Sequence, residues 1–270
     1  MNHTNLEFFT DWFNSYVLYF HTGDINIDVN YILKEEHTQR VRINSANIAN
    51  SISLCENDQL LAEAISLFHD IGRFRQYYDY NSFNDLQTGS HATMGVHVLE
   101  ESNVLACLVE EEQSIILEAI EYHNMISIPT EVTGRTLLHS QLIRDADKLD
   151  GFYVITNENE IRKYSLDPLV EDASFSQNVM NCLIECRNID YKEIKTLCDR
   201  KMLELALVYD LNFQYSRELV IKKGYIEKLI NYLPESKEKN QIKSHFELYL
   251  NRKELTNSGS TSCQWGQSIR

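Results

Sequence analysis

The feature that most constrains the fold is an adjacent histidine and aspartate, His69 and Asp70, at the end of the largely apolar stretch 60–68. A helix that ends in this way places an imidazole and a carboxylate at a buried edge, where polar groups without partners cost free energy. Imidazole nitrogens and carboxylate oxygens are common ligands of zinc, iron and manganese. The pair therefore indicates a divalent metal ion, with a hydrogen-bonded core pair as the alternative.

Ligand-type residues recur at comparable intervals on both sides of this pair. They are His37, His91, His123 and Asp147, and each lies in a segment with the apolar spacing of an amphipathic helix. Several helices of one bundle can project such side chains into a common core, which is how metal sites in bundles are built. The alternative for each histidine is an ordinary surface or core position.

In this order, the residues resemble the HD-domain superfamily of metal-dependent phosphohydrolases. The resemblance rests on the run from Leu67 to Arg73 and on Ala-Asp-Lys-Leu-Asp at 146–150, and it spans roughly residues 30–152. It implies an all-α fold, an HD-domain helical bundle with additional C-terminal helices. It also implies a ligand set for the metal, namely His37, His69, Asp70, His91, His123 and Asp147.

Within this set, His91 and His123 look like the extra ligands of the two-metal branch of the superfamily. Asp147 fits the pattern of the superfamily better than its neighbours Asp145 and Asp150, which compete for the same role. The resemblance thus implies one or two divalent ions as cofactor. Imidazole and carboxylate ligands suit manganese, iron, cobalt or zinc, and magnesium is a further candidate.

Three residues are expected to serve catalysis: Asp70, Arg73 and Lys148. Asp70 can bridge two ions through its two oxygens, and it or a carboxylate such as Asp145 is a candidate for orienting the attacking water. Arg73 can engage a phosphate bidentately, with a surface salt bridge as the alternative. Lys148 either holds a phosphate or pairs with an acidic neighbour.

The expected activity is hydrolysis of a phosphate ester or anhydride in a nucleotide or small phosphorylated metabolite, by a metal-activated water. No convincing Ser-His or Cys-His signature suggests a protein nucleophile. Two alternatives remain open. One is a di-iron oxygenase of the same superfamily, and the other is a non-catalytic nucleotide-binding regulatory module.

Composition limits the partners of this chain. It has 270 residues, of which 43% are hydrophobic, and a formal net charge of −15, which argues against nucleic acid as a partner. No apolar run is long enough for a membrane span, and neither a signal peptide nor a disulfide-like array of the six cysteines is apparent. We therefore expect a cytoplasmic hydrolase with a small phosphorylated substrate, possible homo-oligomers and no membrane association.

The chain divides by pattern into three parts. Residues 1–155 are predicted to form the HD-domain core with an N-terminal helix, 156–255 a helical extension packed on the core, and 256–270 a disordered tail. Asp28 and Asp58 are candidate helix N-caps. The expected helices are 5–21, 28–54, a helix that begins near Asp58 and carries His69, 91–102, 111–125, 135–151, 176–187, 190–210, 213–232 and 236–252. The aromatic stretch 74–90 is expected to be an irregular loop over the substrate.

Overall fold

The structure is a computed structural model, and it describes residues 1–157 and 174–255, the last five of these by their backbone alone. The described residues form α-helices, short 3₁₀ helices and connections, with no β-strand among them. The all-α prediction is therefore confirmed. No helix in this described part is long and apolar enough to cross a membrane. The predicted tail, 256–270, lies outside the described residues.

The described residues divide into two compact units: 1–157 with 207–223, and 174–206 with 224–255. This division differs from the predicted one, which places 207–223 in the extension. The side chain of Asp145 explains the difference, since it accepts hydrogen bonds from the backbone amides of Asn212 and Phe213 and so holds this segment. The packing of the extension on the core stays a prediction.

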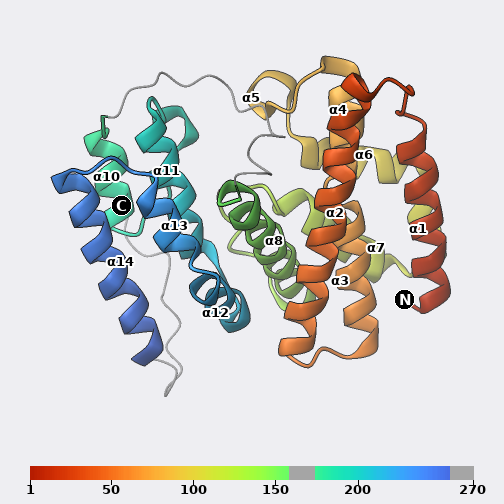
Figure 1. Ribbon diagram of the computed structural model, residues 1–270. Coiled ribbons are helices and arrows are strands. Elements are labelled where there is room, and N and C mark those ends of the chain that lie inside the picture. The colour runs from red at the N-terminus through yellow and green to blue at the C-terminus, as the bar shows by residue number, and fades with distance from the viewer. Residues whose placement is uncertain (158–173, 256–270) are drawn as a thin grey trace. The chain divides into compact units, whose positions relative to one another are not determined.

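The first unit is a bundle in which α2 lies beside α3 and α8, α7 lies beside α6 and α8, and α4 lies beside α6 (Figure 1). Its core is made by fully buried aromatic and aliphatic side chains such as Phe68, Phe74 and Ile48. The bounds of its helices are α1 (His3–Leu18), α2 (Ile25–Ser51), α3 (Glu56–Phe68), α4 (Ile71–Tyr80), α5 (Asp85–Thr88), α6 (His91–Ser102), η1 (Val104–Cys107), α7 (Glu110–Tyr122), α8 (Gly134–Ile155), η3 (Leu207–Asp210) and α12 (Gln214–Lys222).

Two predicted N-caps are wrong. The cap of α2 is Asp24, whose side chain accepts from the amide of Asn26. Asp28 lies inside the first turn and accepts instead from the backbone amides of the preceding turn. Asp58 lies inside the first turn of α3, after the cap residue Cys55, and is bound by Arg135 and His139 of α8.

The helical structure is interrupted between α3 and α4, at the His69-Asp70 pair. His69 is the C-cap of α3 and Asp70 the N-cap of α4, so both side chains project from a junction. The predicted loop 74–90 is wrong in its first half, because α4 continues to Tyr80 and Asn81 ends it in the left-handed conformation. The connection between α4 and α6 is therefore confined to 81–90, and it is irregular except for the one-turn helix α5.

Gly72 sets how closely α4 and α6 approach each other. A Cβ atom at this position would lie 2.2 Å from the carbonyl oxygen of His91 and 2.5 Å from the amide nitrogen of Gly95. Real side chains do not tolerate such distances, so only glycine permits this contact. The close contact brings the first turn of α6, and with it His91, next to the His69-Asp70 junction.

The second unit packs α10 against α11, α11 against α13 and α13 against α14. Two helices predicted as continuous are interrupted. The stretch 190–210 is divided into a 3₁₀ turn, α11 and η3, and the stretch 213–232 is broken at Gly224, whose φ is +64°. The bounds are α10 (Gln177–Ile184), η2 (Tyr191–Glu193), α11 (Leu197–Ala206), α13 (Tyr225–Asn231) and α14 (Lys237–Leu255).

Candidate metal centre

Five buried residues from separate parts of the first unit bring ligand atoms together in two groups. The first group contains His37, His69 and Asp70, and the second contains Asp70, His91 and His123, with the ligand atoms of each group within 4.8 Å of one another. The helices explain this convergence. His37 projects from α2, His69 and Asp70 from the α3–α4 junction, His91 from the first residue of α6 and His123 from the end of α7.

In the first group, the Nε2 atom of His37 is 3.1 Å from the Nε2 atom of His69 and 3.4 Å from Oδ2 of Asp70. Asp147 of α8 extends this group, because its Oδ1 atom is 3.3 Å from Nε2 of His37. The side chain of Asp147 is 37% exposed, whereas those of His37 and Asp70 are 11% and 5% exposed. Solvent can therefore reach the centre beside Asp147.

The second group repeats this geometry around the other oxygen of Asp70. The Nε2 atoms of His91 and His123 are 3.1 Å apart, and they lie 3.2 Å and 3.9 Å from Oδ1 of Asp70. The carboxylate of Asp70 thus lies between the two groups and gives one oxygen to each. A carboxylate in this position suits the bridging role that the sequence predicts for Asp70.

The other ring nitrogen of each histidine is already committed to a hydrogen bond. The Nδ1 atoms of His69 and His123 are 2.8 Å and 2.6 Å from the carbonyl oxygens of Ser66 and Ile120. Because a carbonyl can only accept, Nδ1 carries the hydrogen and Nε2 turns its lone pair toward the centre. Histidine ligands of metals are oriented in this way.

His37 and His91 are fixed by carboxylates instead. Their Nδ1 atoms are each 2.6 Å from a carboxylate oxygen, of Asp150 for His37 and of Asp85 for His91. In each group, the Nε2 atoms of the two histidines thus face each other at a distance of 3.1 Å. Their two lone pairs repel each other unless a shared proton or a cation lies between them. The donor set therefore fits divalent metal ions.

Residues 35–151 match the family model of the HD domain. This segment is an HD domain. The superfamily is that of metal-dependent phosphohydrolases, so the resemblance seen in the sequence is confirmed, and the buried cluster of histidine and aspartate fits its metal site. No curated protein and no solved structure matches the chain.

Electrostatics within the HD domain separate the histidines. Burial lowers the pKa of His69, and burial together with the nearby His91 and His69 lowers the pKa of His123 to about 3. For His37, burial also acts to lower the pKa, but hydrogen bonds with Asp147 and Asp150 outweigh it and raise the pKa to about 9. A proton on His37 therefore has to leave before this side chain can bind a metal ion.

The acidic ligands keep their negative charge. Burial acts to raise the pKa of Asp70, but the positive charge of Lys34 and the neighbouring histidines lower it well below its usual value. The pKa of Asp147 is likewise lowered, because the hydrogen bond and charge of His37 outweigh burial. Both carboxylates are thus ionised and available to a cation.

Arg73 lies beside the centre, with its Nε atom 3.6 Å from Oδ1 of Asp70. Its terminal nitrogen donates to the carbonyl oxygen of Phe83 and to Asp85, each at 2.7 Å, and to Gln76. The guanidinium group therefore links the α4–α6 connection to Asp70. A phosphate-binding role for Arg73 would use the part of the group that faces Asp70.

Lys148 follows Asp147 along α8, and its amine pairs with a carboxylate outside the two ligand groups. Its Nζ atom lies 2.7 Å from Oδ2 of Asp210 in η3. The structure thus shows the acidic pairing that the sequence left as one of two alternatives. Arg144 shares this partner and also donates to the carbonyls of Tyr122 and His123, so it holds the end of α7 that carries His123.

Sequence reasoning missed Lys34 of α2. Its Nζ atom is 2.9 Å from Oδ2 of Asp70 and 5.3 Å from the ring centre of Phe83. The signal that could have found it is its spacing, because residues three apart on a helix share a face and Lys34 precedes His37 by three positions. Asp85 and the orienting role of Asp150 were missed as well.

Asp145 does not reach the centre. Its two oxygens accept from Asn212 and Phe213, so the expectation that it orients the attacking water is wrong. The other described histidines also lie elsewhere: His139, for example, is 3.1 Å from Asp58 at the start of α3. Asp147 is thus the carboxylate of its segment that faces the ligands.

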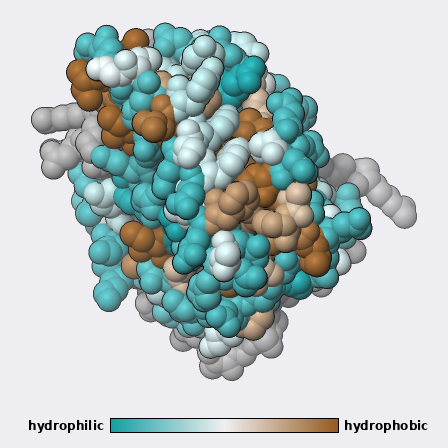
Figure 2. All heavy atoms as spheres, turned by 90° about the vertical axis from the view of Figure 1, so that its right-hand side faces the viewer, coloured by the Kyte–Doolittle hydropathy of each residue, from teal (hydrophilic) through white to brown (hydrophobic). Residues whose placement is uncertain are grey.

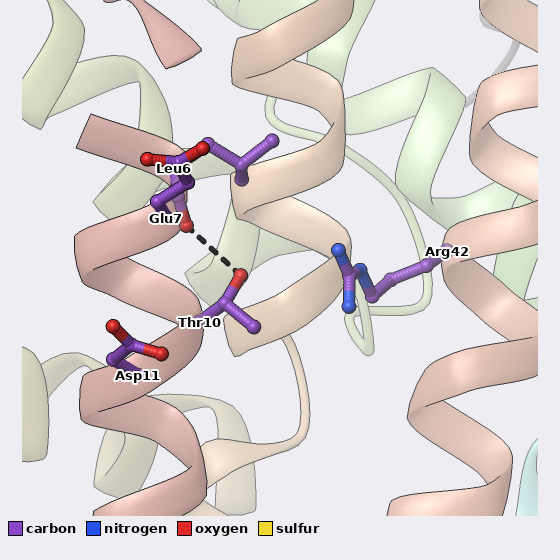
Figure 3. Close-up of a pocket in the computed structure, with 5 residues that line it drawn as sticks. All are labelled: Leu6, Glu7, Thr10, Asp11 and Arg42. Atoms are coloured by element: carbon purple, nitrogen blue, oxygen red, sulfur yellow. Dashed lines mark hydrogen bonds between the residues drawn. The ribbon is translucent and has the colours of Figure 1, made fainter. Parts of the chain in front are cut away.

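A shallow hollow of about 400 Å³ lies between α1 and Arg42 of α2, and Thr10 within it donates to the carbonyl oxygen of Leu6 (Figure 3). None of its five lining residues is a candidate ligand. On the face that includes α1, apolar residues form separate groups divided by hydrophilic ones (Figure 2).

Proposed function

We propose that this HD-domain protein hydrolyses a phosphate ester or anhydride, in a nucleotide or another small phosphorylated metabolite. The observation that carries the proposal is the paired arrangement around Asp70. Its two oxygens face two histidine pairs, and the Nδ1 atom of every one of these histidines is committed to a hydrogen bond. This arrangement suits two divalent ions that share one carboxylate.

Bound ions would supply a hydroxide near neutral pH and would stabilise charge on the phosphoryl oxygens. His37, His69, Asp70 and Asp147 would hold the first ion, and Asp70, His91 and His123 the second. The protein itself controls access of water and substrate to the centre. Its five buried ligands keep bulk water from the centre, and the partly exposed Asp147 would leave an entrance for substrate.

Two cations border the ligands and can bind phosphate oxygens. Lys34 contacts Oδ2 of Asp70, on the side of the first group, and Arg73 lies near Oδ1, on the side of the second. Phe83 lies under Lys34 and stacks on Tyr77, with ring centres 4.9 Å apart. These aromatic rings beside a cationic subsite favour a nucleotide over a purely aliphatic phosphate.

A small substrate agrees better with the charge of the chain than a nucleic acid does. The net charge of −15 opposes the approach of a polyanion, whereas a local ion and a few cations are enough for one phosphate group. The choice among manganese, iron, cobalt, zinc and magnesium is open, because the same ligands suit several of these metals. Location in the cytoplasm and assembly into homo-oligomers stay predictions.

The test is phosphate release from a panel of nucleotides and phosphomonoesters, with Mn²⁺, Fe²⁺, Co²⁺, Zn²⁺ or Mg²⁺ supplied one at a time. Asp70→Asn removes one negative charge from the shared ligand, and Asp79→Asn serves as the matched control, because Asp79 pairs with Arg75 on the exposed side of α4. We expect release by the unmodified chain and by Asp79→Asn, and none by Asp70→Asn.

Full activity of Asp70→Asn would contradict the proposal. Oxygen consumption by the iron-loaded protein, without phosphate release, would identify the oxygenase alternative. Nucleotide binding without any turnover, in protein shown to hold metal, would identify a regulatory module.

A further inference from the structure

Asp85 receives side-chain hydrogen bonds from three separate parts of the HD domain. Its Oδ2 atom is 2.6 Å from Nδ1 of His91 and 2.8 Å from the amide nitrogen of Asn124, the residue after His123. Its Oδ1 atom accepts from Arg73 at 2.7 Å and from Gln76 at 2.8 Å, both on α4. One carboxylate thus connects His91 and the neighbour of His123 with the helix that follows Asp70.

Asp150 has the corresponding position for the first group. It accepts from Nδ1 of His37, and Arg40 donates to both of its oxygens. Each group therefore has one histidine fixed by a backbone carbonyl and one fixed by a carboxylate that is itself paired with an arginine. Asp85 and Asp150 are matched partners in this pattern, so the effects of changing them can be compared directly.

The surroundings of the two carboxylates differ. Asp150 lies on α8, but Asp85 lies on α5, a helix of four residues with no buried residue, in the connection 81–90. Besides the stacking of Phe83 on Tyr77, polar side chains of α4 hold this connection: Arg73 binds the carbonyl oxygen of Phe83, and Gln76 binds the hydroxyl of Thr88. The position of α5 therefore depends on the same network that orients His91.

We propose that Asp85 is a positioning residue that links the second metal ion to the order of the connection 81–90. An ion on Nε2 makes the opposite N–H of an imidazole a stronger donor, so it strengthens the bond to Asp85 and with it the fixation of α5. Because coupling is reciprocal, the fixed connection in turn tightens binding of the second ion. The inference rests on the two-ion centre proposed above.

Metal content of three variants tests this link. Apo-protein is titrated with Mn²⁺, and bound ions per chain are counted for the unmodified protein, Asp85→Asn, Asp150→Asn and the control Asp79→Asn. We expect two ions for the unmodified chain and the control. For Asp85→Asn we expect one ion to bind as before and the other about 10–100-fold more weakly, the cost usual for a lost partner of a metal ligand.

Asp150→Asn identifies which ion is affected. It should weaken the other ion. Asp85→Asn combined with His69→Asn should impair binding of both ions, whereas Asp85→Asn combined with His123→Asn should still bind one ion as before. Two ions of unchanged affinity in Asp85→Asn would overturn the proposal. Equal weakening of both ions in folded Asp85→Asn would also overturn it, because a general structural role predicts that result.

Hydrogen exchange of the unmodified chain gives a second test that needs no variant. The amides of 86–89 bond to Asn84 and Asp85, so their exchange reports the order of α5. We expect the equivalent of Mn²⁺ that fills the His91–His123 group to slow this exchange by about 10–100-fold, the reciprocal of the affinity change, and the other equivalent to leave it unchanged. No change in this exchange after both equivalents have bound would overturn the proposal, even where Asp85→Asn fails to fold.

These readouts are separate from hydrolysis. If the unmodified chain binds a single ion, the role of Asp85 is overturned, while phosphate release with that ion would still support the proposed function. If two ions bind and exchange of 86–89 responds but no phosphate is released, the role of Asp85 holds and the hydrolase proposal fails.

Discussion

The two halves of the metal centre use similar ligands but are held by different kinds of structure. In the first half, the carboxylate that orients His37 is Asp150, which is 1% exposed and lies on α8, a helix of 22 residues packed along α2. In the second half, the carboxylate that orients His91 is Asp85, which is 29% exposed and lies on the four-residue helix α5.

This difference shows that one half follows from the fold and the other from a side-chain network. Long helices form cooperatively and are stabilised by packing, so Asp150 cannot move without disturbing the bundle. A single turn in a connection opens at much lower cost. The second half is therefore the part of the centre that conditions or substitutions can change while the bundle stays folded.

The largest expected effect comes from a substitution that affects both halves equally. Asp70→Ala deletes the ligand that both groups share, so we expect neither ion to be retained and phosphate release to fall to the level of a sample without enzyme. His69→Ala and His123→Ala, which each affect one half, should retain one ion. Metal analysis after gel filtration measures all three, with Asp79→Ala as the control. Two ions in folded Asp70→Ala would contradict the shared role.

A smaller effect is expected where α4 meets α6. In Gly72→Ala, the new Cβ would collide with backbone atoms of His91 and Gly95, and overpacking of this kind costs about 1–3 kcal/mol. Gly151→Ala is the matched control, because its Cβ would meet nothing within 4 Å in α8, and alanine there should be neutral or stabilise by about 0.5–1 kcal/mol.

Gly72→Ala should also distinguish the halves. The displaced atoms belong to the first turn of α6, so binding of the second ion should weaken more than binding of the first. Urea unfolding and metal titration measure the two effects. Equal stability of the two glycine variants would contradict the close approach of Gly72 to the backbone of His91 and Gly95.

The ligands of both halves could be predicted from the sequence, but what orients them could not. His69-Asp70 and the four other ligand-type residues stand in motifs whose spacing and apolar context are visible along the chain. The structure brings all of them together. The carboxylate that binds Nδ1 of His37 could not be predicted in this way, because Asp150 is 113 positions from His37 and nothing in their local sequence links them.

Local structure was hardest to predict where tertiary contacts decide it. The aromatic stretch after Gly72 reads as a loop, yet its first half continues α4 because Phe74 is fully buried in the core. The roles of Arg73 and Lys148 also depend on neighbours. Asp85 and Asp210 come from connections whose positions no periodicity predicts.

The pH dependence of metal binding sharpens the comparison further. Since the pKa of His37 is raised to about 9, this histidine carries a proton at pH 7 that the first ion has to displace. Binding of that ion should therefore tighten as the pH rises toward 9, by up to about tenfold per pH unit. The pKa of His123 is about 3, so this ligand of the second ion has no proton to release at pH 7.

Calorimetry at pH 7 in two buffers with different ionisation enthalpies measures the released proton. His123→Gln, which leaves the first half intact, should still show the release, and His37→Gln should not. A binding enthalpy of the first ion that is the same in both buffers would contradict the raised pKa of His37.

The smallest expected effect concerns the two cations beside Asp70. Lys34 contacts Oδ2 of Asp70 and the ring of Phe83, whereas Arg73 is bound to Asp85, Gln76 and the carbonyl oxygen of Phe83. Lys34→Met should therefore raise KM for a phosphorylated substrate by about tenfold, the cost of one charged hydrogen bond, with both ions retained.

Arg73→Met should act differently, because it removes the arginine that holds Asp85. We expect it to weaken the second ion as well as to lower kcat/KM, so that excess Mn²⁺ restores part of its activity but none of the activity lost in Lys34→Met. Steady-state kinetics at two concentrations of Mn²⁺ separates the variants. Equal rescue of both would mean that Lys34, too, acts through the metal ions, and the two cations would then not divide between the halves as their contacts indicate.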